Sequence, residues 1–150
     1  MPKPSMAWFL SKIIRINMGD LMEKEMIEII KNDQFAKLVG LELVKVELGY
    51  AEVRMVITEK HLNGVGIVQG GALFTLADFA FAAAANADGK VTIGINANIT
   101  YSKPAKGKTL LAKAMETSSS RSLCNYTVDI FDEDNAVLVA KFNATGFIKN

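Results

Sequence analysis

The sequence contains very little cysteine and histidine, with one residue of each among 150. A single cysteine, Cys124, excludes a disulfide within the chain and favours a reducing compartment, so we predict a cytoplasmic protein. One histidine and one cysteine are too few for the usual zinc site built from these ligands, and we predict no bound metal.

The chain also lacks a charge excess and a long hydrophobic run. Its net charge of +1 is far from the strongly basic balance of general nucleic-acid binders, so we predict no nucleic-acid partner. The apolar run over 71–85 is shorter than the roughly 20 residues of a membrane span, and Asp78 interrupts it. Near the N-terminus, Lys12 and Arg15 break the apolar stretch that a signal peptide needs, and we predict no stable membrane association.

Half of the residues are hydrophobic, and the length suits one domain with a sizeable core. Hydrophobic periodicity predicts a helix over 20–31, a pair of strands within 41–57 divided at Gly49, and an apolar helix over 72–87. Four further strands follow, within 91–105, 108–119, 121–131 and 136–148. One apolar helix among antiparallel strands indicates an α+β domain whose curled sheet wraps around that helix.

The helix over 72–87 carries one charged residue, Asp78, and no lysine or arginine lies within helical reach of it. Burial of an unpaired carboxylate is costly, so the sequence leaves two interpretations open. Asp78 either reaches the surface or caps a neighbouring element, or it is a reactive carboxylate whose surroundings make it a better base.

The residues Gln69, Gly70 and Gly71 precede this helix directly. Glycines at a helix start let a ligand approach the backbone, and the free N–H groups there favour a developing negative charge. A glycine pair is also common in ordinary loops. The glycine pair is therefore more informative in combination with the carboxylate eight residues beyond Gly70.

With these residues the chain resembles the hotdog-fold acyl-CoA thioesterases of the phenylacetate-pathway (PaaI-like) family. The family pattern is close to H-x-N-x-x-G-x-x-H-G-G-x-x-x-x-L-x-D. This sequence matches it with His61, Asn63, Gly66, Gly70, Gly71, Leu76 and Asp78, and the segment NITYSKPA follows downstream. The resemblance extends over about 40–148, and it implies that the apolar helix is the central helix of a hotdog fold.

The resemblance also implies roles for individual residues. The N–H group of Gly70 would polarise the thioester carbonyl, Asn63 would hold that carbonyl or the attacking water, and Asp78 would act as general base or, less favoured, as nucleophile. No metal and no cofactor is implied, since coenzyme A is part of the substrate. Further candidates for substrate binding around this motif are Gln69, Gly71, His61 and Asn96.

Two positions depart from the family pattern. Gln69 stands where the family usually has a histidine, and an amide cannot titrate. The position aligned with a water-holding hydroxyl of some members is Gly94, for which Thr92 or Asn96 would have to substitute.

Coenzyme A carries phosphates, which require cations near the mouth of a site. Our candidates are Lys103, Lys106, Lys108 and Arg121. The alternative is that these lysines form an ordinary solvated turn.

Helix geometry predicts a shared site. Gly70 and Asp78 are eight residues apart, about 12 Å along one helix, which is too far to serve one thioester. Two antiparallel helices across a two-fold axis would bring Asp78 of one subunit to Gly70 of the other, and the resemblance implies the same arrangement. We therefore predict a homodimer as the minimal active unit, and we expect two dimers to assemble into a homotetramer.

For the domain organisation, we predict that residues 1–19 are a peripheral segment and that residues 20–150 form a single hotdog domain.

The leading hypothesis is hydrolysis of an acyl-CoA thioester. One rival is an acyl-CoA binder or sensor on the same fold, which would not need Asp78. Another is a dehydratase acting on acyl carrier protein, but such enzymes rely on a histidine in the site, and His61 precedes the loop. The acyl group stays open among aryl-acetyl, benzoyl-like and medium fatty acyl chains.

Overall fold

A computed structural model of the chain describes residues 6–149, and over 7–18 it describes the backbone alone. Ten elements follow one another in this part of the chain. They are α1 (Met6–Lys31), α2 (Gln34–Val39), β1 (Leu41–Glu47), β2 (Tyr50–Val56), the short 3-10 helix η1 (Glu59–His61), α3 (Gly70–Ala85), β3 (Thr92–Tyr101), β4 (Thr109–Ser119), β5 (Leu123–Asp132) and β6 (Val137–Ile148).

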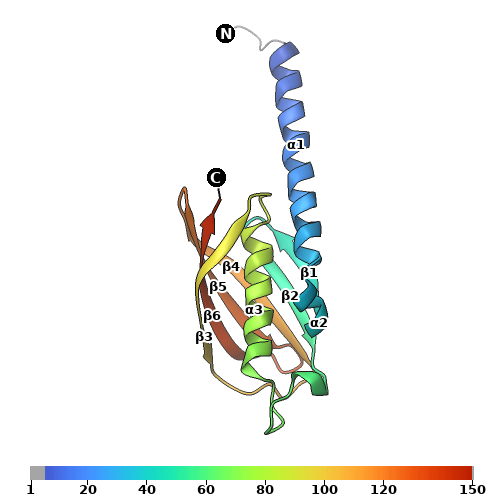
Figure 1. Cartoon of the computed structure of the whole chain (residues 1–150), viewed down its shortest axis with the longest axis vertical. Coiled ribbons are helices and arrows are strands. Elements are labelled where there is room, and N and C mark those ends of the chain that lie inside the picture. The colour runs from blue at the N-terminus through green and yellow to red at the C-terminus, as the bar shows by residue number, and fades with distance from the viewer. Residues whose placement is uncertain (1–5, 150) are drawn as a thin grey trace.

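The six strands of the described residues form one antiparallel sheet in the order β1-β2-β4-β5-β6-β3. The sheet is not closed, so β1 and β3 are its edges. The long helix α3 lies across one face of the sheet, and α1 projects beyond the sheet (Figure 1). The predicted architecture, an antiparallel sheet around one central apolar helix with a peripheral N-terminal helix, is confirmed.

The core lies between α3 and the sheet. Alternate residues of β5, namely Cys124, Tyr126, Val128 and Ile130, are buried, as their period-two pattern predicts. Two edge-to-face aromatic pairs join the helix to the sheet: Phe74 with Phe142, and Phe81 with Tyr126. The buried apolar residues of α3 therefore pack against a single surface, the face of the sheet that the helix covers.

Two features at the N-terminal side differ from the sequence-based expectation. Helix α1 begins at Met6 rather than at residue 20, so Asp20 lies inside the helix. The short helix α2 was not expected; Asp33 caps it by accepting a hydrogen bond from the N–H of Ala36, and Gly40 ends it at a φ of 78°. Six residues are too few for a periodic pattern to reveal.

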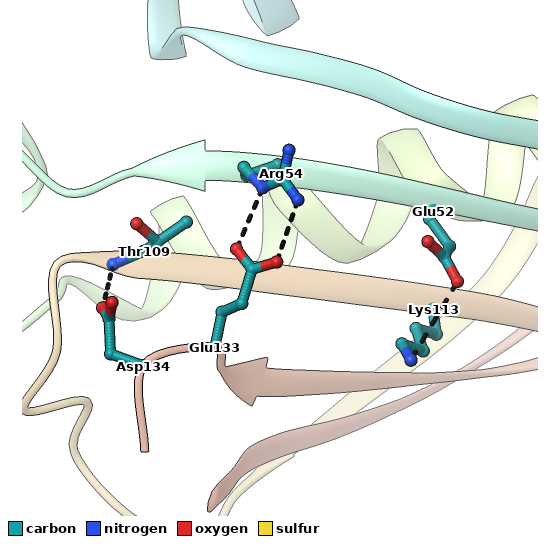
Figure 2. A network of polar contacts seen from close by, with 6 residues as sticks. All are labelled: Glu52, Arg54, Thr109, Lys113, Glu133 and Asp134. Carbon is teal, nitrogen blue, oxygen red and sulfur yellow. Dashed lines mark hydrogen bonds and ion pairs between the residues drawn. The ribbon is translucent and has the colours of Figure 1, made fainter. Parts of the chain in front are cut away.

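The turn after β5 is held to the neighbouring strands by polar contacts (Figure 2). Arg54 of β2 forms two hydrogen bonds of 2.9 Å with the carboxylate of Glu133, and Asp134 accepts the N–H of Thr109. The Arg54 guanidinium lowers the pKa of Glu133 mainly by this hydrogen bonding. These contacts attach the turn to β2 and β4.

The buried Asp132 organises the lysine-containing turn from inside. Its carboxylate accepts the N–H groups of Lys106 and Gly107 at 2.9 and 2.8 Å, and also the N–H and the side-chain amide of Asn135. Burial alone would raise the pKa of Asp132, but these hydrogen bonds outweigh it and lower the pKa to about 2. Asp132 therefore fixes the backbone of the turn as a charged residue.

Candidate active site

The first turn of α3 leaves one backbone donor free. The side-chain oxygen of Gln69 accepts the N–H groups of Gly71 and Ala72, and its main-chain oxygen accepts those of Ala72 and Leu73. The N–H of Gly70 has no acceptor among the described residues. A single free donor at the positive end of the helix dipole is suited to binding a developing negative charge.

Gly70 is held in place by the edge strand β3. The phenol of Tyr101 donates a hydrogen bond of 3.1 Å to the carbonyl oxygen of Gly70. A Cβ atom at Gly70 would lie 2.9 Å from that phenol oxygen, and one at Gly71 would lie 2.7 Å from the side-chain oxygen of Gln69. A larger residue at either position would therefore displace the Tyr101 phenol or the Gln69 side chain from its present hydrogen bonds.

Asn63 belongs to the loop that precedes α3 and lines the same cavity as Gly70. Its side-chain oxygen accepts the N–H groups of Val65 and Ile67 within its own loop, which leaves its NH₂ group without a partner in the described chain. Asn63 and Gly70 line the same cavity of about 380 Å³, together with Tyr101 and Lys103. The cavity therefore combines two unused N–H donor groups from separate segments.

Asp78 lies on the one stripe of α3 that the sheet leaves uncovered, in line with Gly71 and Thr75, and it is exposed in the single chain. The apolar composition of this helix predicts burial on every side, but the structure leaves one stripe of it exposed. Partial burial raises the pKa of the Asp78 carboxyl, and the Asp33 carboxylate of α2 adds to this rise. No described residue forms a hydrogen bond or ion pair with Asp78, so the carboxylate has no structural partner.

The thioesterase superfamily model matches residues 65–139, which include Gly70 and Asp78. The chain belongs to the thioesterase superfamily. It is 36% identical over 109 residues to a putative esterase of Archaeoglobus fulgidus, covering 72% of this chain and 71% of that protein. It is 34% identical over 104 residues to the acyl-coenzyme A thioesterase PaaI of Escherichia coli, covering 69% and 74% of the two chains.

Solved structures support the same assignment of this thioesterase. The E. coli PaaI protein from the phenylacetic acid degradation operon superposes with a TM-score of 0.80 at 28% identity, covering 86% of this chain and 94% of that one. A hypothetical thioesterase from Streptococcus pneumoniae, solved with coenzyme A, gives 0.74 at 25% identity, covering 83% and 97%. The PaaI-like hotdog resemblance is confirmed.

His61 of the thioesterase is buried, and both of its ring nitrogens are engaged. Nδ1 accepts the N–H of Thr58 at 3.0 Å, so Nε2 carries the proton and donates to the carbonyl oxygen of Val39 at 2.8 Å. His61 lines a groove with Gln69. Its geometry favours a structural contribution to the site, namely fastening the loop to the end of α2.

The predicted cations separate into two places. Lys103 lines the cavity of Asn63 and Gly70, and it shares a second cavity of about 500 Å³ with Lys106. Lys108 belongs to the same turn, and its N–H donates to Asp134. Arg121 instead follows Ser119 and Ser120, which line a cavity at the opposite end of α3, so one chain does not bring it to the lysines.

Asn96 lies on the exposed edge strand β3, and no hydrogen bond joins it to the other candidates in the described chain. Gly94 faces Phe81, since a Cβ there would lie 3.2 Å from that ring.

The sequence did not predict a role in the site for Tyr101 or Asp33. Tyr101 lies within the NITYSKPA segment of the family resemblance, and that was the one available signal; nothing in the sequence distinguishes Asp33.

Residues 6–149 contain no group of three histidine, cysteine, aspartate or glutamate side chains arranged to hold a metal ion. None of the described helices has the length and apolarity that crossing a membrane requires.

Proposed function

We propose that this thioesterase hydrolyses an acyl-CoA thioester to a carboxylic acid and coenzyme A. The observation that carries the proposal is one cavity lined by both Gly70, whose N–H is free, and Asn63, whose side-chain NH₂ is free. In hydrolysis, the carbonyl oxygen of the thioester becomes an oxyanion, and donors already aimed at it stabilise the transition state without reorganisation. The Gly70 N–H is the main donor, and the Asn63 amide assists it.

Asp78 acts as the general base in this proposal. It removes a proton from water, the water oxygen attacks the carbonyl carbon, and the thiolate of coenzyme A leaves as the carbonyl reforms. A carboxyl whose pKa is raised holds the abstracted proton better than an ordinary aspartate. Its lack of an ion-pair partner keeps it available for the water.

The two halves of the machinery come from different subunits. The helix separates Gly70 from Asp78 by about 12 Å, whereas an attacking water must lie about 3 Å from the carbon. The edge strand β3 exposes Ile93 and Ile95 and has an unpaired edge, as β1 does. A second copy pairing along β3 would cover this edge and carry its Asp78 towards Gly70.

The CoA part of the substrate is supported by two similar proteins. The E. coli relative is named an acyl-coenzyme A thioesterase, and the S. pneumoniae structure contains coenzyme A. In this chain, Lys103, Lys106 and Lys108 project from the turn beside the Asn63 cavity and are proposed to contact the phosphates. We propose no cofactor or metal, a dimer or dimer of dimers, and a cytoplasmic location.

The direct test is a panel of acyl-CoA substrates with detection of the free thiol. Asp78→Asn should lower turnover by at least about a hundredfold, the lower range for a general base, while acyl-CoA still binds. The fold should be retained, since Asp78 supports no other group. A rate close to wild type would refute the base assignment, and binding without any wild-type turnover would favour the acyl-CoA sensor.

Subunit mixing tests the shared site. Asp78→Ala and Asn63→Ala proteins should each lose most of their turnover, but a heterodimer contains one doubly substituted site and one intact site. Activity should therefore return after subunit exchange, with the exchange verified by native mass spectrometry. If heterodimers form and remain inactive, the groups act within one chain.

A further inference from the structure

The groove that His61 and Gln69 line flanks the start of α3, on the side of α2. Its volume is about 350 Å³, and it is lined by Phe35 and Val39 of α2 and by Gly71, Ala72 and Thr75 of α3. Thr75 lies about one helical turn before Asp78 on the uncovered stripe of α3. Asp33, which caps α2, is close enough to Asp78 for its charge to act there. The groove therefore ends at Thr75, about one helical turn from the proposed base.

The polar groups around this groove are largely engaged with one another. His61 uses both ring nitrogens, and the hydroxyl of Thr75 donates to the carbonyl oxygen of Gly71 at 2.8 Å. The side-chain oxygen of Gln69 is occupied by backbone N–H groups. What the groove offers a ligand is mainly hydrocarbon surface, with Lys60 as its one charged lining residue. Such a surface favours an apolar group over a phosphate or a sugar.

The wall formed by α2 is fixed at both ends. Asp33 caps its first turn, the N–H of Gly40 donates to the carbonyl oxygen of Lys37, and the Val39 carbonyl is held by His61. Phe35 has the largest apolar side chain in the lining, and 58% of it is exposed. A large ring on an anchored helix sets a boundary that a ligand must fit.

We propose that this groove binds the acyl group of the substrate and that Phe35 limits the length of the acyl chain that fits. The inference rests on the acyl-CoA hydrolysis proposed above and adds a specificity-determining residue to it. With the thioester carbon beside Asp78, the chain extends along Thr75 and Ala72 towards Phe35. Replacement of the ring by a smaller side chain lengthens the groove.

The test compares kcat/KM for straight-chain substrates from butanoyl-CoA to decanoyl-CoA. Phe35→Ala should raise the ratio of decanoyl to butanoyl hydrolysis about tenfold or more. This is the effect expected when the groove accommodates one or a few additional methylene groups of the acyl chain. Phe35→Trp should lower the same ratio. Leu38→Ala is the matched control, since Leu38 belongs to the same helix, is 76% exposed and does not line the groove. Its ratio should equal that of wild type.

The outcomes separate this inference from the proposed function. If wild type hydrolyses no acyl-CoA, the proposed function fails and the groove assignment falls with it. If wild type is active but Phe35→Ala and Leu38→Ala shift the ratio equally or not at all, only the groove assignment is wrong. A change of oligomeric mass in Phe35→Ala, measured by light scattering, would identify the groove as a subunit contact and also refute it. Should Phe35→Ala fail to fold, Phe35→Leu and Phe35→Trp provide the same comparison.

Discussion

The two ends of α3 differ in how completely their polar groups are satisfied. At the end of the helix, Asn86 donates to the carbonyl oxygens of Ala82 and Thr92 and accepts the N–H of Thr92, while Tyr126 bonds Ala84 and Glu116. At the start, the N–H of Gly70 and the amide of Asn63 have no partner among residues 6–149. One end uses its hydrogen bonds for stability, and the other keeps donors unused, which is the arrangement that binding a substrate requires.

The largest effect on stability is expected at the satisfied end. Asn86→Ala removes three side-chain hydrogen bonds and leaves both main-chain groups of Thr92 without these partners. Unfolding free energy should fall by about 3 kcal/mol, as measured by urea denaturation. At temperatures where the variant is folded, its turnover should equal that of wild type. A large loss of turnover in the folded variant would contradict the division between the two ends.

Two tyrosines provide a matched pair across the helix. Tyr101→Phe removes the hydrogen bond to Gly70 and should lower kcat about tenfold with little change in KM, because the oxyanion donor loses its fixed position. Tyr126→Phe removes the hydrogen bonds to Ala84 and Glu116 at the other end. It should lower stability by about 1 kcal/mol and leave kcat unchanged.

Thermal melts and steady-state kinetics on both variants decide this comparison. Each substitution removes one hydroxyl and keeps the ring, so the two proteins differ mainly in the end of α3 that they affect. Equal losses of kcat in the two variants would mean that the start of the helix has no special role.

The charge of Asp33 reaches the middle of α3, and its effect should be seen in the pH dependence. Asp33→Asn preserves the helix cap, since asparagine caps as well as aspartate, but it removes a negative charge near Asp78. The pKa of Asp78 should fall, so the acid limb of kcat/KM should move to lower pH. Asp88→Asn, beyond the other end of the helix, is the control and should leave the limb in place. A movement to higher pH, or none, would show that Asp33 does not influence the base.

The smallest effect is expected at Gln69. Its side chain caps α3 through an oxygen acceptor, and the unprotonated nitrogen of a neutral histidine can also accept a hydrogen bond. Gln69→His should therefore retain turnover within about threefold and show no additional pH step. A folded but inactive variant would indicate that the amide contacts the substrate directly.

Much of the fold followed from local patterns. The alternation in β5 and the apolar run of α3 predicted their buried faces, because each element has to bury its hydrophobic side against another. The start of α1 and the existence of α2 did not follow. Helix α2 depends on a cap, a C-terminal glycine and the contact of His61 with Val39, and none of these produces a periodic signal. The division into residues 1–19 and 20–150 remains a prediction.

The sequence by itself determined which residues we propose for the chemistry: a glycine pair at a helix start, an asparagine in the preceding loop and a lone carboxylate in an apolar helix. Only the tertiary structure decided which groups are available. Tyr101 reaches Gly70 across 31 positions of the chain, and Asp33 acts on Asp78 from another helix. Whether an N–H donor is free, or the pKa of a carboxylate is shifted, depends on its neighbours in space. Folding brings these neighbours together from distant segments, and the order of the segments in the chain does not tell which of them will be close.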